Sequence, residues 1–294
     1  MEKCNICPRK CNIDRNIYKG YCGMDDTLVV ARAALHMWEE ECISGKEGSG
    51  AVFFAGCNLR CVFCQNRNIS KNGAGKTITV DRLADIFCEL QKKGANNINL
   101  VTPTHYTKQI MAALDIAKDK GLNIPVVYNR GGYESVDTIK ELKGYVDIFL
   151  PDFKYVDKNI SKRYSNCEDY FDVAKKGLAA MYEIVGNPQF DERGMMKKGV
   201  IVRHLMLPGH VKDSKSVLKY LHETYGNNIY ISIMSQYTPL VDKDKYKEIA
   251  RKLYPAEYKR LVDYAIDIGI VNGFVQEGDV ADESFIPEFD CEGV

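Results

Sequence analysis

The sequence predicts an α/β fold, a partial (β/α)6 barrel of the TIM-like type with a small cysteine-rich N-terminal metal module. From about residue 50, six short apolar runs alternate with helical patterns. The chain has 294 residues, 45% of them hydrophobic, which suffices for one large core. Residues 1–40 break this alternation and are rich in cysteines and turns. We therefore expect the module at 1–40, the barrel at 41–240 and a helical extension packing on it at 241–294.

The six apolar runs predict strands because they are short and rich in β-branched and aromatic residues. They cover residues 51–54, 98–101, 125–128, 146–150, 200–205 and 229–234. Strands that alternate with helices predict right-handed βαβ units and a parallel sheet. The functional site of such a fold lies at the carboxyl ends of the strands.

The helical patterns between these runs place apolar residues on single faces. In the first, Thr79 is expected to cap the helix and Gly94 to end it. The expected buried faces are Leu83, Ile86, Phe87 and Leu90; Ile110, Met111, Leu114 and Ala117; Val173, Leu178 and Met181; and Val217, Leu218 and Leu221. Two more helical patterns, around 244–253 and 256–268, precede a short apolar run at 270–275.

Charge and hydropathy exclude some classes of function. Lys plus Arg and Asp plus Glu each number 40, so no basic excess points to nucleic acid. No stretch approaches the roughly 18 consecutive apolar residues of a membrane span, and no signal peptide is apparent. We expect a cytosolic protein. Because the cytosol keeps thiols reduced, the 11 cysteines are better interpreted as metal ligands where they cluster than as disulfides.

Three cysteines, Cys57, Cys61 and Cys64, follow the first predicted strand with C-x3-C-x2-C spacing. Cysteine thiolates are the usual ligands of iron–sulfur clusters. Three thiolates on a four-iron cluster leave one iron open to a substrate. The alternative is a zinc knuckle or buried structural thiols, but zinc needs a fourth ligand and none stands nearby at a usual spacing.

This spacing, with Phe63 before the last cysteine and a strand before the loop, resembles the signature of the radical S-adenosylmethionine (SAM) superfamily. The resemblance implies a [4Fe–4S] cluster whose open iron binds the amino and carboxylate groups of SAM. An electron from the cluster then splits SAM into methionine and a 5′-deoxyadenosyl radical. Phe63 is expected near the adenine.

Further segments look like the PflX-type radical SAM proteins, which are relatives of pyruvate formate-lyase activating enzyme. These segments are Glu39-Glu40 with 48–50, then 64–66, 129–133, 150–155, 203–209 and 234–237. The resemblance implies that Asp152, Lys154 and Arg203 handle SAM, with Lys154 first and Arg203 second as partners of its carboxylate. Asn129 stands where the activating enzymes have an acidic residue, which argues against a bound monovalent cation.

The segment after the second strand departs from the family pattern, which expects small residues that grip the SAM amino group. Here Thr102 and Thr104 could supply the oxygens. The next residue, His105, is either an acid, base or substrate contact or a structural histidine. His204 fits a structural role within its strand. His36 either reaches the site or joins the N-terminal module to the barrel, and Glu39 and Glu40 either face the substrate or are solvated.

Four more cysteines, Cys4, Cys7, Cys11 and Cys22, lie within nineteen residues at the N-terminus. Four thiolates can close a zinc or iron site or hold an auxiliary [4Fe–4S] cluster, so we expect a second metal site here. A metal-free module is the alternative, but so short a segment has little core of its own. Cys88 falls within a helical pattern and is interpreted as packing.

Together these features predict a radical SAM enzyme that abstracts hydrogen from an unknown small-molecule, peptide or protein substrate, with a flavodoxin or ferredoxin-type reductant. One alternative is an activase that installs a glycyl radical on a partner enzyme, although the ferredoxin-like insertion of many activases is missing after Cys64. Alternatives of other classes are a non-catalytic iron–sulfur electron carrier and a nucleic-acid modification enzyme. Neutral charge lowers the last of these.

Overall fold

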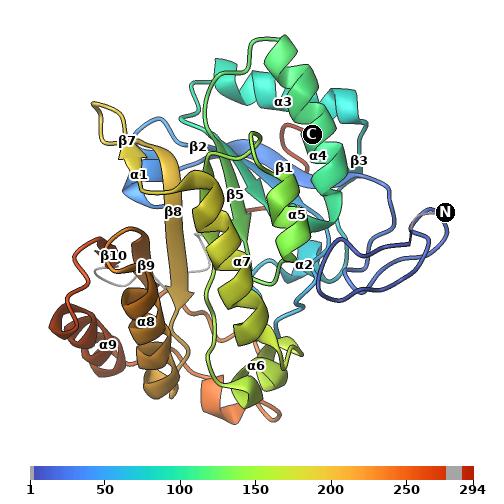
Figure 1. Cartoon of the computed structure of the whole chain (residues 1–294). Coiled ribbons are helices and arrows are strands. Elements are labelled where there is room, and N and C mark those ends of the chain that lie inside the picture. Colours follow the sequence, from blue (N-terminus) through green and yellow to red (C-terminus); the bar gives the residue numbers. More distant parts are fainter. Residues whose placement is uncertain (1–2, 276–286) are drawn as a thin grey trace.

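Seven parallel strands form the centre of the fold in the computed structural model, which describes residues 3–275 and 287–294 (Figure 1). In spatial order they are β2 Ser49–Phe54, β4 Ile98–Val101, β5 Val126–Arg130, β6 Ile148–Pro151, β8 Met196–Leu205, β9 Tyr230–Met234 and β10 Gly273–Val275. The first six confirm the six predicted strands. The run at 270–275 adds β10, which pairs in parallel with β9.

The sheet stays open. Its order runs from β10 at one edge to β3 (Lys76–Thr77) at the other, and the two edges do not pair. Three strands are antiparallel: β1 (Val29–His36) on β2, β3 on β1, and β7 (Gln189–Phe190) on β8. The fold is therefore an α/β fold with a mostly parallel, curved sheet that does not close into a full barrel.

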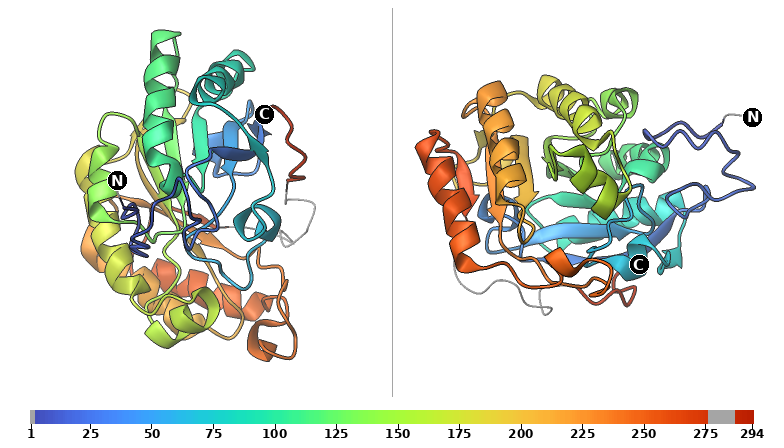
Figure 2. Two further views of the ribbon diagram at one scale, coloured as in Figure 1. Left: turned by 90° about the vertical axis from the view of Figure 1, so that its right-hand side faces the viewer. Right: turned by 90° about the horizontal axis from the view of Figure 1, so that it is seen from below.

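Helices cover one face of this sheet (Figure 2). The longer ones are α3 Val80–Lys92, α4 Thr107–Asp119, α6 Lys158–Ser165, α7 Tyr170–Val185, α8 Val211–Tyr225 and α9 Pro255–Asp267; shorter ones are α1 Glu41–Ser44, α2 Arg67–Ser70, α5 Val136–Glu141 and the 3-10 helices η1 Thr104–Tyr106 and η2 Lys247–Ile249. The expected start of α3 is confirmed, because the Thr79 hydroxyl accepts the Arg82 amide at 3.1 Å. Its four predicted face residues are buried.

The prediction of a helix around 244–253 is wrong. Only the short η2 forms there, because the carboxylate of Asp242 accepts the amides of Asp244 and Lys245 at 2.9 and 3.1 Å and turns the chain. The second pattern, at 256–268, is confirmed as α9. Among residues 3–275 and 287–294, none of the helices has the length and hydrophobicity to cross a lipid bilayer.

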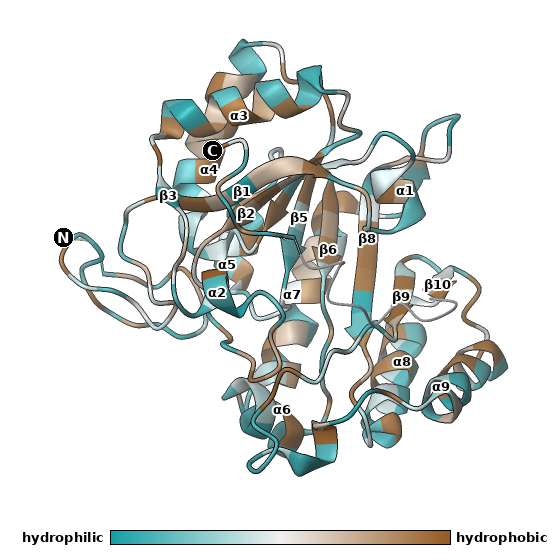
Figure 3. Cartoon of the chain, turned by 180° about the vertical axis from the view of Figure 1, so that it is seen from behind, coloured by the Kyte–Doolittle hydropathy of each residue, from teal (hydrophilic) through white to brown (hydrophobic). Residues whose placement is uncertain are grey.

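The N-terminal segment packs against the barrel and enters the sheet. Its residues 29–36, expected within the cysteine-rich module, form β1 and pair with β2, so the sheet begins before the expected boundary at residue 40. Residues 3–28 are loops; the Ser135 and Thr138 hydroxyls bond to the Ile6 carbonyl at 3.0 and 2.5 Å. The view from behind shows these loops projecting beside β1 and α2 (Figure 3).

The C-terminal residues 287–294 run along β1. The Ala33 amide donates to the Glu292 carbonyl at 2.8 Å, and the Cys291 amide donates to the Ala31 carbonyl at 3.0 Å. These bonds cover backbone groups of β1 that would otherwise form an exposed sheet edge. Residues 287–294 thus lie along β1 as an extended chain rather than a helix.

One buried carboxylate predicts a pH effect on stability. Asp213, 9% exposed, accepts the amides of Val156 and Asp157 at 3.1 and 2.8 Å, and burial raises its pKa from 3.8 to about 6. Because folding raises this pKa, the stabilisation is complete below pH ~4 and is lost as the pH rises through about 6. We expect Asp213→Asn to gain about 3 kcal/mol of unfolding free energy relative to wild type between pH 4 and pH 8.

Urea unfolding of both proteins across that range measures this difference. Asp172→Asn, an exposed change on α7, is the control and should track wild type. Parallel stability curves for Asp213→Asn and wild type would contradict the assignment.

Candidate active site

A cavity of about 240 Å³ opens at the carboxyl ends of the parallel strands. Its walls include two of the three loop cysteines, Cys61 and Cys64. They also include the predicted residues Phe63, Asn129, Asp152, Lys154 and Arg203. The end of β1, the loop before α1 and the segment after β9 contribute further lining residues; among them are His36, Trp38, Glu39, Gln236, Tyr237 and Thr238.

The cysteine loop leaves β2 in a backbone conformation that requires glycine at its start. Gly56 has φ of +86°, and a Cβ there would lie 2.3 Å from Met24 Cγ and 3.0 Å from both the Cys22 carbonyl oxygen and His105 Nε2. Any side chain at this position would therefore displace the loop. The Cys57 amide donates to the Cys22 carbonyl at 3.1 Å, which fixes the loop against the N-terminal segment.

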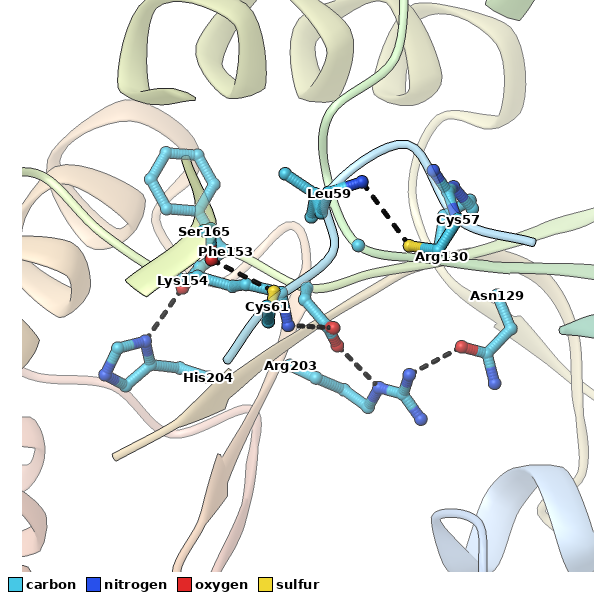
Figure 4. Close-up of polar contacts among 12 residues, drawn as sticks. Cys57, Leu59, Cys61, Asn129, Arg130, Phe153, Lys154, Ser165, Arg203 and His204 are labelled. Atoms are coloured by element: carbon cyan, nitrogen blue, oxygen red, sulfur yellow. Dashed lines mark hydrogen bonds and ion pairs between the residues drawn. The ribbon is translucent and has the colours of Figure 1, made fainter. Parts of the chain in front are cut away.

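Each loop thiol has a polar neighbour, and Figure 4 shows those of Cys57 and Cys61. The Leu59 amide donates to Cys57 Sγ at 3.4 Å, Cys61 Sγ lies 3.0 Å from Ser165 Oγ, and Cys64 Sγ lies 3.3 Å from Ser70 Oγ. Hydrogen bonds to the sulfurs are among the features that tune iron–sulfur clusters. Burial raises the pKa of Cys61 to about 11, whereas the Lys154 cation acts in the opposite direction.

The three loop thiols fit a four-iron cluster better than a single ion. Within the described part of the chain, no three Cys, His, Asp or Glu side chains form a group that could hold one metal ion. In a four-iron cluster each thiolate binds a different iron, so the sulfurs need not meet at one point. The donor chemistry and the open cavity beside Cys61 and Cys64 fit a cluster with one open iron.

A buried ion pair that was not predicted from the sequence holds the cysteine loop in place. The Arg130 side chain, 3% exposed, bonds to both the Glu134 carboxylate and the Asn58 side-chain oxygen. Asn58, between the first two loop cysteines, donates to the Tyr133 carbonyl at 2.7 Å. A buried guanidinium needs such full pairing. Only the Asn-Arg-Gly-Gly-Tyr segment, 129–133, drew attention to this region in the sequence.

Of the predicted site residues on the loops after β2 and β4, Cys57, Thr102, Thr104 and His105 lie outside the cavity walls. The Thr104 hydroxyl donates to Glu134 at 3.0 Å instead. His105 Nε2 lies 2.6 Å from the Ala55 carbonyl oxygen, and burial lowers the His105 pKa to about 3, so the ring is neutral. This placement favours the structural role for His105, which holds the chain two residues before Cys57.

The charged wall of the cavity centres on Arg203 (Figure 4). Its guanidinium bonds to Asn129 Oδ1 at 2.5 Å, Glu39 Oε2 at 3.0 Å and Asp152 Oδ1 at 3.2 Å. Asp152 also accepts from Lys154 Nζ at 2.6 Å. Burial alone would raise the pKa of Asp152, but the Lys154 and Arg203 cations outweigh it and hold that pKa below its ordinary value.

The structure separates residues whose roles the sequence left open. Glu39 and His36 line the cavity, and burial lowers the pKa of His36. Glu40 is not among the lining residues, although Arg203 acts on its charge; burial raises the pKa of Glu40, and its Oε2 atom has no hydrogen-bond partner. His204 points away from the cavity, and its Nδ1 lies 2.8 Å from the Phe153 carbonyl, which supports its structural role.

Of the four N-terminal cysteines, Cys11 and Cys22 lie close together. A Cβ on Gly20 would lie 3.5 Å from Cys22 Sγ and 3.6 Å from Cys11 Sγ, so these two thiols flank one point. Burial raises the pKa of Cys22, and the Cys4 and Cys11 thiols add to the effect, which places Cys4 nearby. Cys7 instead faces Asn58 and the Arg130–Glu134 pair.

Comparison with known proteins assigns the chain to a family. Uncharacterized protein MJ0674 of Methanocaldococcus jannaschii is 29% identical over 275 residues, 90% of this chain and 75% of that protein. The crystal structure of Streptococcus suis SuiB bound to precursor peptide SuiA superposes with a TM-score of 0.50 at 13% identity. The superposition covers 76% of this chain, and this chain spans about half of SuiB (47%). At this identity the match shows a likeness of fold alone. Residues 51–221, more than half of the sequence, match the radical SAM superfamily, and the chain therefore belongs to that superfamily of enzymes.

Proposed function

We propose that this protein holds a [4Fe–4S] cluster at Cys57, Cys61 and Cys64, binds SAM in the adjoining cavity and cleaves it reductively to take a hydrogen atom from a substrate. One observation carries the proposal. The cysteine loop and two paired cations, Lys154 and Arg203, face the same cavity at the carboxyl ends of the strands. When bound, the cluster supplies the electron that cleaves SAM.

The residues of the chain bind and orient SAM in this proposal. Lys154 and Arg203 offer charge-assisted hydrogen bonds to its carboxylate. Phe63 is 6% exposed, and its ring centre lies 6.0 Å from that of Tyr237, so the two rings form an apolar wall suited to the adenine. The described walls of the cavity limit the access of water to the reacting atoms.

The finer assignment is to the PflX-type proteins, with an unknown small-molecule, peptide or protein substrate and a flavodoxin or ferredoxin-type reductant. The support is the group of strand-end residues Asn129, Asp152, Lys154 and Arg203, which share one hydrogen-bonded network. Eleven free thiols suit a reducing cytosol. A non-catalytic electron carrier would have no need of this charged cavity.

Installation of a glycyl radical on a partner enzyme is the second candidate. It is favoured by the Asp152 and Lys154 pair, which resembles the activating enzymes and lies in the cavity wall. Against it, α2 begins at Arg67, three residues after Cys64, and leaves no room for a ferredoxin-like insertion.

Anaerobic reconstitution with iron and sulfide, followed by dithionite and SAM, tests the main proposal. We expect wild type to form 5′-deoxyadenosine and Cys57→Ala to lose more than about 99% of this activity, since one cluster ligand is lost. Cys88→Ala, a change of the same kind in α3, is the control and should stay active. A cluster-loaded wild type that forms no 5′-deoxyadenosine and shows no spectral response to SAM would contradict the proposal.

We also propose a second metal centre at Cys4, Cys11 and Cys22. Three observations support it: Cys11 and Cys22 flank one point beside Gly20, Cys4 lies near Cys22, and the Tyr21 amide donates to Cys11 Sγ at 3.2 Å. Amide-to-sulfur bonds commonly accompany metal-bound thiolates. Of the expected centres, zinc, iron or an auxiliary iron–sulfur cluster, we favour the cluster, because no three Cys, His, Asp or Glu side chains of the described residues are placed to hold one metal ion.

Metal counting on cysteine variants tests the second centre. We expect Cys11→Ala and Cys22→Ala to lose the additional zinc or iron, measured by plasma emission spectrometry, while the cluster at the loop remains. Cys7→Ala should keep both, because its thiol faces Asn58 rather than the other three. Equal metal loss in Cys7→Ala would restore the four-cysteine set, and unchanged metal in all variants would rule out the centre.

A further inference from the structure

Glu39 lies outside the segment that matches the superfamily, residues 51–221, and belongs to the short loop between β1 and α1. The loop has a defined shape. The Glu39 amide donates to Ser44 Oγ at 3.1 Å, and the Ser44 hydroxyl donates to the His36 carbonyl at 3.1 Å. Only 8% of the Glu39 side chain is exposed, so the carboxylate projects inward between the strands.

Both oxygens of this carboxylate are used. Oε1 accepts from the side-chain amides of Asn99 on β4 and Asn129 on β5, at 2.9 and 3.1 Å. Oε2 accepts from Arg203 Nη1 on β8 at 3.0 Å. The Glu39 side chain, from a loop, therefore links three parallel strands at the charged wall of the cavity. A buried carboxylate is stable only when it is paired in this way.

Arg203 is held in one orientation by three different partners. A guanidinium has five N–H groups. Three of those on Arg203 point at Glu39, Asn129 and Asp152, which lie on three different elements. The fork is planar and rigid, so these three bonds also fix the direction of the remaining two N–H groups. Arg203 lines the cavity, so we assign these two N–H groups to a bound carboxylate.

We propose that Glu39 is a positioning residue for SAM binding, which holds the Arg203 guanidinium so that its remaining N–H groups meet the SAM carboxylate. The inference rests on the proposed function. It adds a residue that precedes the superfamily segment and acts through Arg203 rather than by touching SAM.

A second role for Glu39, as a simple counter-charge, predicts the opposite effect on affinity. The cavity wall holds two cations, Lys154 and Arg203, against two carboxylates, Glu39 and Asp152, and Glu40 acts on Arg203 from outside the wall in every variant. Loss of the Glu39 charge alone would leave an excess positive charge and strengthen the attraction for a carboxylate. Loss of Arg203 orientation would weaken binding. The sign of the change in SAM affinity therefore separates the two roles.

Glu39→Gln is the informative variant because it keeps the size of the side chain. Its amide oxygen can still accept from Asn99 and Asn129, but its NH₂ group then meets Arg203 Nη1, donor against donor. The matched control is Glu41→Gln, the same change two residues along, where the side chain is exposed at the start of α1. Arg203→Ala and the double variant complete a thermodynamic cycle.

SAM binding to the cluster-loaded proteins is measured anaerobically by titration calorimetry, with thermal unfolding as the check on folding. We expect Kd to rise about tenfold in Glu39→Gln, since one charge-assisted hydrogen bond is lost. Arg203→Ala should raise Kd further, and the double variant should resemble Arg203→Ala because Glu39 acts only through Arg203. Glu41→Gln should bind SAM as wild type does.

Three results would overturn the inference. They are tighter or unchanged SAM binding in Glu39→Gln, full additivity of the two single changes, or an equal loss in Glu41→Gln. If Glu39→Gln unfolds at a lower temperature, Asn99→Ala serves as a second variant, because it removes one Glu39 partner without adding a donor beside Arg203. The inference then requires that Asn99→Ala binds SAM more tightly than Glu39→Gln. Failure of wild type to bind SAM at all would instead refute the proposed function.

Discussion

The pairing of buried positive charge is the constraint on which the rest of this structure depends. Two arginines on neighbouring parts of the sheet, Arg130 and Arg203, are largely removed from water and must be neutralised within the protein. Arg130 is paired with Glu134 and bonds to Asn58, which fixes the back of the cysteine loop. Arg203 is paired with Glu39 and Asp152, and these ion pairs fix the charged wall of the cavity. Each ion pair neutralises a buried positive charge and also holds residues of the site in place.

The strands, and the edge of the sheet where the site lies, could be predicted because they depend on local patterns. Short runs of β-branched residues, separated by amphipathic segments with caps such as Thr79, have few other solutions in a chain of this composition. The cysteine spacing is also local. It therefore predicted the loop, and the order of the βα units placed Asn129, Asp152, Lys154 and Arg203 at one edge of the sheet. The cavity contains all four.

What the sequence could not predict depends on contacts between distant residues. Glu39 and Arg203 are 164 residues apart, and nothing in either segment indicates that they meet. β1 is alanine-rich and follows a cysteine-rich stretch, so its pairing with β2 was missed. Thr104 and His105 follow a strand end, as site residues do, but their side chains form hydrogen bonds with buried neighbours instead. The Thr104 hydroxyl bonds to Glu134, and the His105 ring bonds to the Ala55 carbonyl. Proximity to a strand end indicates where a site lies but not which way each side chain points.

The crowding around Gly56 has a consequence for how the protein is assembled. Met24, the Cys22 carbonyl and His105 leave no space for even one methyl group behind the loop, and the N-terminal segment is bonded across it. The cysteine loop and the N-terminal segment must therefore be packed together: a displacement of Met24 or Cys22 would move Gly56 and, one residue further on, Cys57. Assembly of the loop thus depends on a segment that precedes the whole parallel sheet in the sequence.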